Sequence, residues 1–254
     1  MTDRKHSSSL FFKNVNRIRR PLAAGVKMWE NARFVLADVP LDRREVKRIL
    51  PWGMWPQDPP TATLFIANYT KTSFTVPYKE GALLIHVRTP LGSGLHCPWM
   101  IVDDDTALIY GRELLGYPKK SGQLTFKEAG DRITASISRR GVTVLKIEVE
   151  RTRHESRPRP VFNLKTFNAG GPGQLFVIQP IWLFRPKETI HKSWSAKAKV
   201  TLGTSDYDPI ARLVSGPPFN GRFVVMDILG SRYNIPVGIA GIRWFVNTFD
   251  MRFR

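Results

Sequence analysis

Hydrophobic and polar positions alternate with a period of two over much of this 254-residue chain. Such alternation is typical of strands with one buried face, and Gly, Pro or Asp clusters punctuate the runs. The pattern predicts strands over 63–69, 73–78, 82–88, 99–102, 106–110, 175–183 and 197–202. Ile133, Ala135 and Ile137 alternate with polar residues, and the pattern resumes in 141–150, so we expect a hairpin over 132–150. The chain is therefore predicted to be mainly β.

Helical spacing is confined to short stretches. Val46, Ile49 and Leu50 fall on one helical face and Pro51 follows them, which predicts a helix over 41–50. One helical turn is expected at 208–213, and the apolar, aromatic end at 235–249 is expected to form core or interface. We find neither an internal repeat nor a domain linker. The expected organisation is a basic N-terminal arm over 1–29 and a single domain, mainly β with a few short helices, over 30–254.

The composition is typical of a folded protein in a reducing compartment. The hydrophobic content of 42% allows a substantial core, and no apolar run reaches the length of a transmembrane helix. Cys97 is the single cysteine, so an intramolecular disulfide is impossible, and we expect it to be a small buried residue. These features lead us to expect a cytoplasmic protein.

The formal net charge of +18 permits binding to nucleic acid or to an anionic membrane. The Lys and Arg residues are scattered, however, and no zinc-finger spacing, RNP motif or helix-turn-helix pattern accompanies them. We therefore favour a solvated basic surface, which can also steer anionic substrates such as keto acids. The histidines lack metal-ligand spacing, so no metal site is expected.

The run from Gly111 to Lys120, GRELLGYPKK, carries the clearest chemical signal. Lys119 and Lys120 follow Tyr117 and Pro118 in an otherwise apolar neighbourhood. An ammonium group beside a second one, where water is scarce, has a lowered pKa and becomes a nucleophilic amine that forms Schiff bases with ketones. The alternative interpretation is a basic surface turn with Pro118 as its breaker.

This run resembles the active-site segment of the acetoacetate decarboxylase family, whose pattern reads Gly-Arg-Glu-Leu-x-x-Tyr-Pro-Lys-Lys. Segments similar to the family's also occur at 78–87, 162–165 and 189–194, so the resemblance spans about 30–250, although the central segment alone is specific. It implies an antiparallel β-barrel or cone-like double sheet with an enclosed pocket. It also implies a homo-oligomer that acts on a small keto acid without a cofactor.

The resemblance assigns roles to individual positions. Lys119 would form the Schiff base, and Lys120 would lower its pKa or orient the segment. Glu80 would orient polar groups in the pocket, and Tyr117 would be a wall residue or proton partner. Arg33 is the best match for the family's carboxylate-binding arginine, in a region where the alignment allows a shift of one residue. An ordinary surface arginine is the alternative there.

One position departs from the family. Typical decarboxylases carry a second pocket glutamate where this chain has Phe65, and no acidic residue occurs between Asp58 and Glu80. Phenylalanine cannot exchange a proton, which weakens the case for decarboxylation of acetoacetate itself but leaves Schiff-base chemistry intact. Beside a β-keto acid decarboxylase, two hypotheses therefore remain: an aldolase or dehydratase that uses the same imine, and a non-catalytic basic binding protein.

The two residues after Gly111 have a structural interpretation. Arg112 and Glu113 are charged neighbours just before the lysines. We expect them to form an ion pair that fixes this segment, without a direct chemical role.

Overall fold

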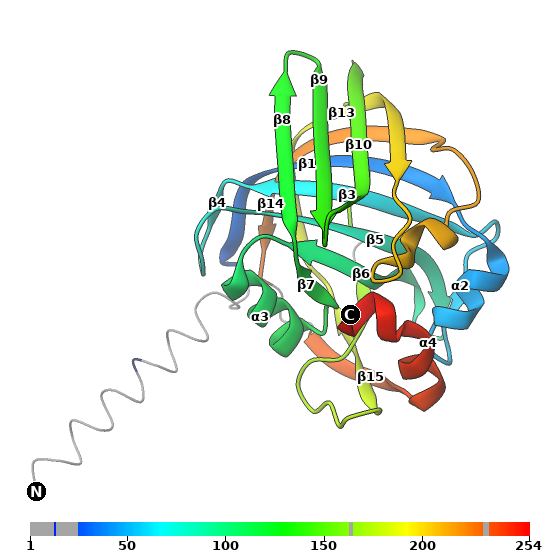
Figure 1. Ribbon diagram of the computed structural model, residues 1–254. Coiled ribbons are helices and arrows are strands. Elements are labelled where there is room, and N and C mark those ends of the chain that lie inside the picture. The colour runs from blue at the N-terminus through cyan, green and yellow to red at the C-terminus, as the bar shows by residue number, and fades with distance from the viewer. Residues whose placement is uncertain (1–12, 14–24, 163–164, 231–233) are drawn as a thin grey trace, which may run out of the picture.

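The computed structural model of the chain describes residue 13 and residues 25–162, 165–230 and 234–254. Its described part is mainly β, as the sequence predicts (Figure 1). The strands are β1 Lys27–Pro40, β2 Trp55–Pro56, β3 Thr61–Tyr69, β4 Lys71–Thr72, β5 Tyr78–Thr89, β6 Gly92–Val102, β7 Lys119–Ser121, β8 Gln123–Ala129, β9 Arg132–Arg139, β10 Val142–His154, β11 Thr166–Ala169, β12 Gln179–Phe184, β13 Lys187–Leu202, β14 Asn220–Leu229 and β15 Asn234–Ala240. The helices are α2 Arg43–Ile49, α3 Asp105–Leu115, α4 Ile242–Phe253 and the 3₁₀ turn η1 Pro209–Arg212.

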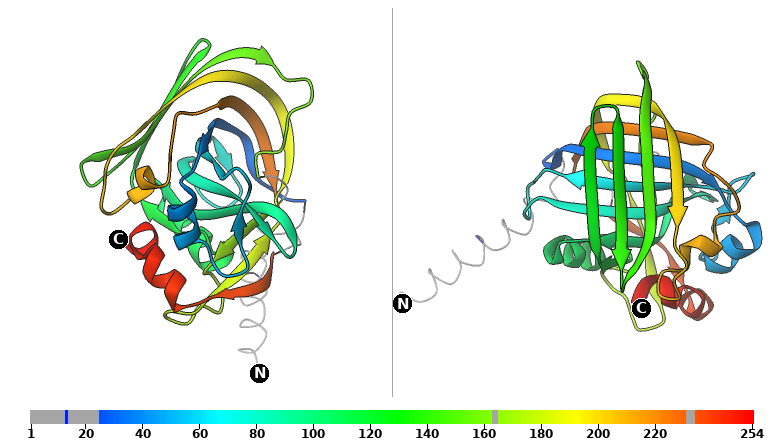
Figure 2. Two further views of the ribbon diagram at one scale, coloured as in Figure 1. Left: turned by 90° about the vertical axis from the view of Figure 1, so that its right-hand side faces the viewer. Right: turned by 45° about the horizontal axis from the view of Figure 1, so that its top comes forward.

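All these strands belong to one continuous sheet in the order β15-β12-β11-β6-β5-β3-β1-β14-β13-β10-β9-β8, with β2, β4 and β7 paired to its sides. The sheet is strongly curved and folds over itself, so that β8, β9 and β10 cross over β1, β3 and β5 (Figures 1 and 2). Strands must twist and coil to pack in this way. The result is the cone-like double sheet expected from the sequence.

The alternating side chains of the middle layer fill two separate cores. One face of β3 and β5 packs with β9 and β10 in an outer core, which includes Ile66, Leu83, Ile137 and Ile147. The opposite face supplies an inner core, which includes Phe34 of β1, Phe65 of β3 and Leu84 of β5, and which α3 and residues 161–162 cover. Because both faces of the middle layer are buried, β3 and β5 carry nearly continuous apolar runs.

Most of the expected elements are confirmed. The predicted strands at 63–69, 82–88 and 99–102 lie within β3, β5 and β6, and the predicted hairpin is formed by β9 and β10. The predicted short helix is α2, where the Asp42 side chain accepts hydrogen bonds from the backbone N–H groups of Arg44 and Glu45. The predicted helical turn is η1, and the apolar end of the chain forms β15 and α4.

Two strand predictions are wrong, and the strand predicted over 175–183 is right only in part, because residues 175–178 form a turn and β12 begins at Gln179. Residues 106–110 lie in α3, because Asp104 caps the helix by accepting from the N–H of Ala107 at 2.7 Å, and Gly116 ends it in the left-handed region at φ 71°. Residues 73–77 form an irregular turn, in which the hydroxyl of Thr72 accepts from the N–H of Thr75 at 3.0 Å. In both places a local side-chain hydrogen bond overrides the alternating pattern.

The predicted N-terminal arm lies largely outside the described residues. Its last residues, 27–29, belong to the sheet and not to an arm, because β1 begins at Lys27 and pairs with β14. Within the described ranges, the model has no helix with the length and apolar character needed to span a membrane. Cys97 is fully buried, as predicted, and burial raises the pKa of its thiol well above the ordinary value.

Candidate functional site: a buried lysine–glutamate pair

The short strand β7 sends the two adjacent lysines to opposite faces of the sheet. It runs parallel to β6, with Lys119 opposite Met100 and Lys120 opposite Ile101. Met100 belongs to the inner core and Ile101 to the outer core. Because side chains alternate along a strand, Lys119 enters the inner core and Lys120 lies on the other side.

The turn between α3 and β7 fixes the path of the Lys119 side chain. The N–H of Tyr117 donates to the carbonyl of Gly111 at 2.9 Å, which folds the chain back on the helix. A Cβ atom on Gly111 would overlap Cδ and Cε of Lys119, so only glycine leaves room for this side chain to cross the helix. The packing therefore explains the first glycine of the motif.

Arg112 holds the backbone of the same segment. Its Nη1 donates to the carbonyl of Lys119 at 3.0 Å and to the carbonyl of Arg252 in α4 at 3.1 Å. Glu113 is exposed. The predicted structural role of Arg112 is therefore present, but it acts through two carbonyls and not through the expected partner Glu113.

Lys119 and Glu80 form a buried ion pair between Nζ and Oε2. Their side chains are 5% and 6% exposed. The hydroxyl of Tyr69 donates to Oε1 of Glu80 at 3.3 Å, and Lys119 Nζ lies 5.7 Å from the ring centroid of Tyr78. The pair therefore has little water and two aromatic neighbours, so its electrostatic interaction is stronger than on a surface.

A small cavity of about 30 Å³ opens beside this pair. Apart from Lys119 and Glu80, its lining residues are uncharged and include Trp29, Tyr69, Tyr117, Phe162, Phe184 and Ile228. Among the described residues, no guanidinium group lines this cavity. The volume is about that of one water molecule, so a substrate needs side chains to move aside before it enters.

The tyrosines around the cavity are neutral hydrogen-bonding groups. Burial raises the pKa of Tyr69, Tyr78 and Tyr117 well above the ordinary value, and the nearby charge of Glu80 adds to the shift at Tyr69 and Tyr78. The hydroxyl of Tyr117 lies 3.1 Å from the hydroxyl of Thr166, and that of Tyr78 accepts from Trp29 Nε1 at 2.8 Å. These contacts hold in place Tyr117 and Trp29, which line the cavity.

Lys120 belongs to a different polar network. Its Nζ lies 2.6 Å from Asp208 Oδ1 and donates to the carbonyls of Tyr207 and Asp250 at 2.8 and 3.0 Å. Asp208 also accepts from Trp99 at 2.8 Å and from Arg139 at 3.0 Å. The network ties β7 to the turn before η1 and to α4, so the geometry gives Lys120 a structural environment.

Burial governs the titration of this second pair. It lowers the pKa of Lys120 to about 8, although hydrogen bonding and charge from Asp208 act in the opposite direction. Burial alone would raise the pKa of Asp208, but the contacts from Lys120 bring that pKa below its ordinary value. The counter-charge nearest to Lys120 is therefore Asp208, and the counter-charge nearest to Lys119 is Glu80.

The structure does not bring the remaining two predicted residues to the cavity lining. Phe65 is fully buried next to it, with its ring centroid 5.5 Å from that of Phe34 and 6.1 Å from that of Phe162. Arg33 points away from the inner core and pairs with Glu128 of β8 at 2.8 Å. A shift of one residue would replace Arg33 with Ala32 or Phe34, so neither neighbour supplies a cation.

Trp29 and Tyr69 line the cavity but were not anticipated from the sequence. The register of β3 and β5 places Tyr69 opposite Tyr78 and Ala67 opposite Glu80, so the pairing of these strands was the signal that could have found Tyr69. Within the described ranges, no group of three or more His, Cys, Asp or Glu residues is arranged to hold a metal ion.

Known structures share this fold. An acetoacetate decarboxylase from Legionella pneumophila is 16% identical, with 85% of this chain and 88% of that chain covered and a TM-score of 0.77. A second acetoacetate decarboxylase is 18% identical over 85% and 91% of the two chains, with a TM-score of 0.74. The enduracididine biosynthesis enzyme MppR, complexed with pyruvate, is 17% identical over 79% and 87%, with a TM-score of 0.67.

A comparison with curated protein sequences found no match. The sequence model of the acetoacetate decarboxylase family, in contrast, matches residues 18–232, which include the GRELLGYPKK run, both residues of the buried pair and most of the curved sheet. With more than half of the chain matched, this protein belongs to the acetoacetate decarboxylase family.

Proposed function

We propose that this protein is a Schiff-base-forming lyase in which Lys119 captures the carbonyl group of a small β-keto acid. The single observation that carries the proposal is the buried contact between Lys119 and Glu80 beside a cavity. A lysine held in an apolar site next to one carboxylate has both a nucleophile and a nearby proton acceptor.

The pair accounts for every proton in imine formation. Glu80 takes a proton from the Lys119 ammonium group, and the free amine attacks the carbonyl carbon. A second N–H proton passes from the nitrogen to the former carbonyl oxygen, which gives a neutral carbinolamine. Glu80 then returns the proton to the hydroxyl group, which leaves as water. The product iminium carries the same single positive charge as the original ammonium, so it keeps the Glu80 carboxylate as its partner.

The apolar cavity favours the next step for a β-keto acid. When CO₂ leaves, the electrons of the breaking carbon–carbon bond neutralise the iminium and give an enamine. An anionic carboxylate and a cationic iminium thus become neutral groups, a change that low-dielectric surroundings assist. Protonation of the enamine carbon and addition of water then release the ketone and regenerate Lys119.

A second candidate keeps the imine and changes the later step. Of the residues that the structure describes, one carboxylate and no guanidinium line the cavity. By the family resemblance, Phe65 stands where typical decarboxylases carry a second glutamate. An enamine that forms without loss of CO₂ can instead attack an aldehyde or expel a leaving group. These observations favour an aldolase or dehydratase that acts on a keto acid such as pyruvate.

Borohydride trapping tests the common step. The protein is incubated with acetoacetate or, separately, with pyruvate, reduced, and examined by intact mass and peptide mapping. We expect an adduct on Lys119 that is absent from Lys119→Met and retained by Lys127→Met, which removes an exposed lysine of β8. Release of CO₂ from acetoacetate would favour the decarboxylase, whereas trapping without CO₂ would favour the second candidate.

An adduct on any other lysine would contradict the assignment. Absence of an adduct with both ketones, in protein shown to be folded, would remove the support for either enzyme. The non-catalytic binding protein would then be the preferred hypothesis, and salt-sensitive retention on nucleic acid or anionic vesicles would test it.

A further inference from the structure

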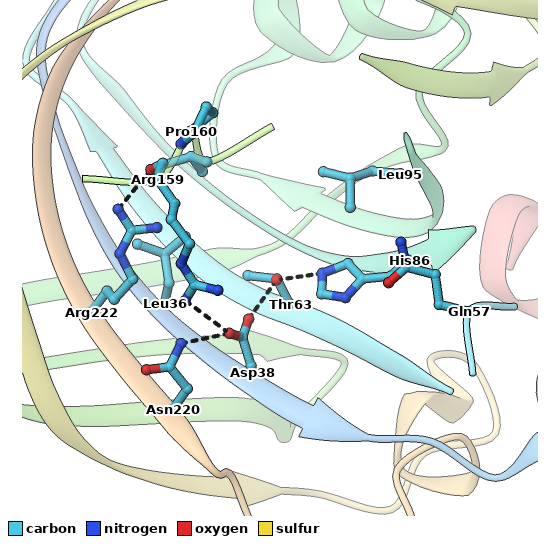
Figure 3. Close-up of a pocket in the computed structure, with 11 residues that line it drawn as sticks. Leu36, Asp38, Gln57, Thr63, His86, Leu95, Arg159, Pro160, Asn220 and Arg222 are labelled. Carbon is cyan, nitrogen blue, oxygen red and sulfur yellow. Dashed lines mark hydrogen bonds and ion pairs between the residues drawn. The ribbon is translucent and has the colours of Figure 1, made fainter. Parts of the chain in front are cut away.

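A larger cavity lies on the same face of the middle layer, at the other end of the strands (Figure 3). Its volume is about 320 Å³, roughly ten times that of the cavity at Lys119. Glu80 lines the first cavity and His86 the second, and six residues of a strand span ~20 Å. On β3, Phe65 lies between Tyr69 of the first cavity and Thr63 of the second. The two cavities are therefore separate.

One wall of the larger cavity is a rigid polar relay. Asp38 accepts from the hydroxyl of Thr63 at 2.6 Å and from the amide of Asn220 at 2.7 Å. Because the hydroxyl of Thr63 donates its proton to Asp38, the oxygen of that hydroxyl accepts a hydrogen bond from Nε2 of His86 at 3.0 Å. Nδ1 of His86 then accepts from the hydroxyl of Thr61 at 2.8 Å. Every member has a partner, so the wall is preorganised.

Two arginines form the basic edge of this cavity, and they differ in how firmly neighbouring groups hold their side chains. Arg222 is 6% exposed, and its Nε donates to Glu155 at 3.3 Å while its Nη2 donates to the carbonyl of Arg159 at 2.8 Å. The side chain of Arg159 is 68% exposed, and its one ion-pair contact is with Asp38 at 3.8 Å. Arg159 can therefore turn toward a ligand without breaking a close hydrogen bond to Asp38.

The remaining wall is apolar. Leu36 of β1, Leu95 of β6, Pro160 and Val161 line it. A cavity with one apolar wall and one mobile guanidinium suits a ligand with a short hydrocarbon body and an acidic group. A doubly charged phosphate fits less well than a singly charged carboxylate. Asp38 lies 3.8 Å from the same guanidinium and repels two negative charges more strongly than one.

We propose that this cavity is a second binding site, for a small aliphatic carboxylate whose acidic group pairs with Arg159. The basic edge favours a negatively charged ligand, and the leucines contact the aliphatic chain of that ligand. The positive charge of the whole protein, formally +18, adds a long-range attraction for such an anion. The site is independent of Lys119 and goes beyond the proposed imine chemistry.

Hexanoate is the probe, because it has no ketone and cannot form an imine. Calorimetry with the full chain compares it with neutral hexanamide and with hexylamine, which carries the opposite charge. We expect saturable binding of hexanoate only, with ¹³C-methyl shifts at Leu36, Leu95 and Val161. Arg159→Gln should weaken binding about tenfold, since it removes a charge-assisted hydrogen bond. Arg157→Gln, in the same exposed segment, should leave affinity unchanged.

Several results would overturn the proposal. They are equal binding of hexanamide, preference for hexylamine, methyl shifts elsewhere, no saturable binding in the millimolar range, or equal affinities of the two arginine variants. Lys119→Met should bind hexanoate normally. This last measurement separates failure of the second site from failure of the imine chemistry, which borohydride trapping tests alone.

Discussion

Lys119 and Lys120 are neighbours in the chain, yet their surroundings differ almost completely. Lys119 contacts Glu80 in an aromatic pocket and lies beside a cavity. Lys120 contacts Asp208 and two backbone carbonyls in a network that joins β7 to α4. A strand turns successive side chains to opposite faces, so the two adjacent lysines of the motif enter separate environments.

This difference changes the physical account of the motif. Two adjacent lysines suggest that one ammonium group destabilises the other. In the fold the two ammonium groups lie on opposite faces of the sheet, and each contacts its own buried carboxylate. In the proposed chemistry, Lys119 is activated by transfer of its proton to Glu80, and Lys120 holds the strand through Asp208 and two carbonyls.

The largest expected effect is on the Lys120 side. Asp208→Asn leaves the Lys120 and Arg139 charges without their buried carboxylate, so the free energy of unfolding should fall by about 3 kcal/mol. Urea unfolding at neutral pH measures this. Asp206→Asn, at a side chain that is 80% exposed, is the matched control and should change it by less than about 0.5 kcal/mol. Equal losses in the two variants would contradict the proposed role of the network.

On the Lys119 side, the expected effect is kinetic. Glu80→Gln retains the size of the side chain but removes the proton acceptor, so the rate of imine trapping should fall about 100-fold, at the lower end for a general acid–base group. Single-turnover borohydride trapping measures the rate. Glu113→Gln, an exposed carboxylate of α3, is the control. Wild-type rates in Glu80→Gln would show that another group moves the proton.

The pH dependence of stability should include a contribution from Lys120. Its pKa is about 8 in the folded protein and about 10.5 in the unfolded chain, so between these pH values the unfolded state binds more protons. Stability contributed by this residue therefore rises with pH, at up to about 1.4 kcal/mol per pH unit. Lys120→Met removes this term, so the difference in unfolding free energy between wild type and Lys120→Met should increase from pH 8 to pH 9.5.

Titrations common to both proteins cancel in that difference. A difference that is flat over this range would mean that Lys120 keeps its proton and that its folded pKa is not lowered. Urea unfolding at closely spaced pH values provides the measurement.

The smallest effect is expected at Arg33. It forms a half-exposed pair with Glu128 outside the inner core, so Arg33→Gln should change the unfolding free energy by less than about 0.5 kcal/mol. Trapping of acetoacetate and of neutral acetone should both match wild type. A loss of trapping with acetoacetate but not with acetone would show that Arg33 recognises a carboxylate. The surroundings of Lys119 would then include a cation that the structure places elsewhere.

Several elements of the fold follow directly from local patterns. Val46 and Ile49 with Asp42 before them specify α2, and the alternation around Ile133 and Ile137 specifies the β9–β10 hairpin. The turn at 73–77 and the helix α3 were missed. Their residues alternate or are apolar, and the hydrogen bonds that Thr72 and Asp104 accept from backbone N–H groups, which decide both elements, depend on geometry.

The candidate site was anticipated in part. The motif pointed to Lys119, and the family resemblance at 78–87 pointed to Glu80. The fold provides their contact through the pairing of β5 with β6 and of β6 with β7. The partner of Lys120 could not be inferred, because Asp208 is 88 positions away and no pattern links the two. The outward direction of Arg33 depends on the phase of β1, where a register shift between Trp29 and Ala32 intervenes.

By itself the sequence determined the mainly β character, the helix α2, the turn η1, the family and the presence of the paired-lysine motif, because these depend on local periodicity and residue order. The tertiary structure alone decided which carboxylate each lysine meets, which residues close the cavity, and where the second cavity lies. Those features arise from strand pairing and from sheet curvature, which bring together side chains far apart in the chain, and the free energy of such contacts depends on burial that no local pattern encodes.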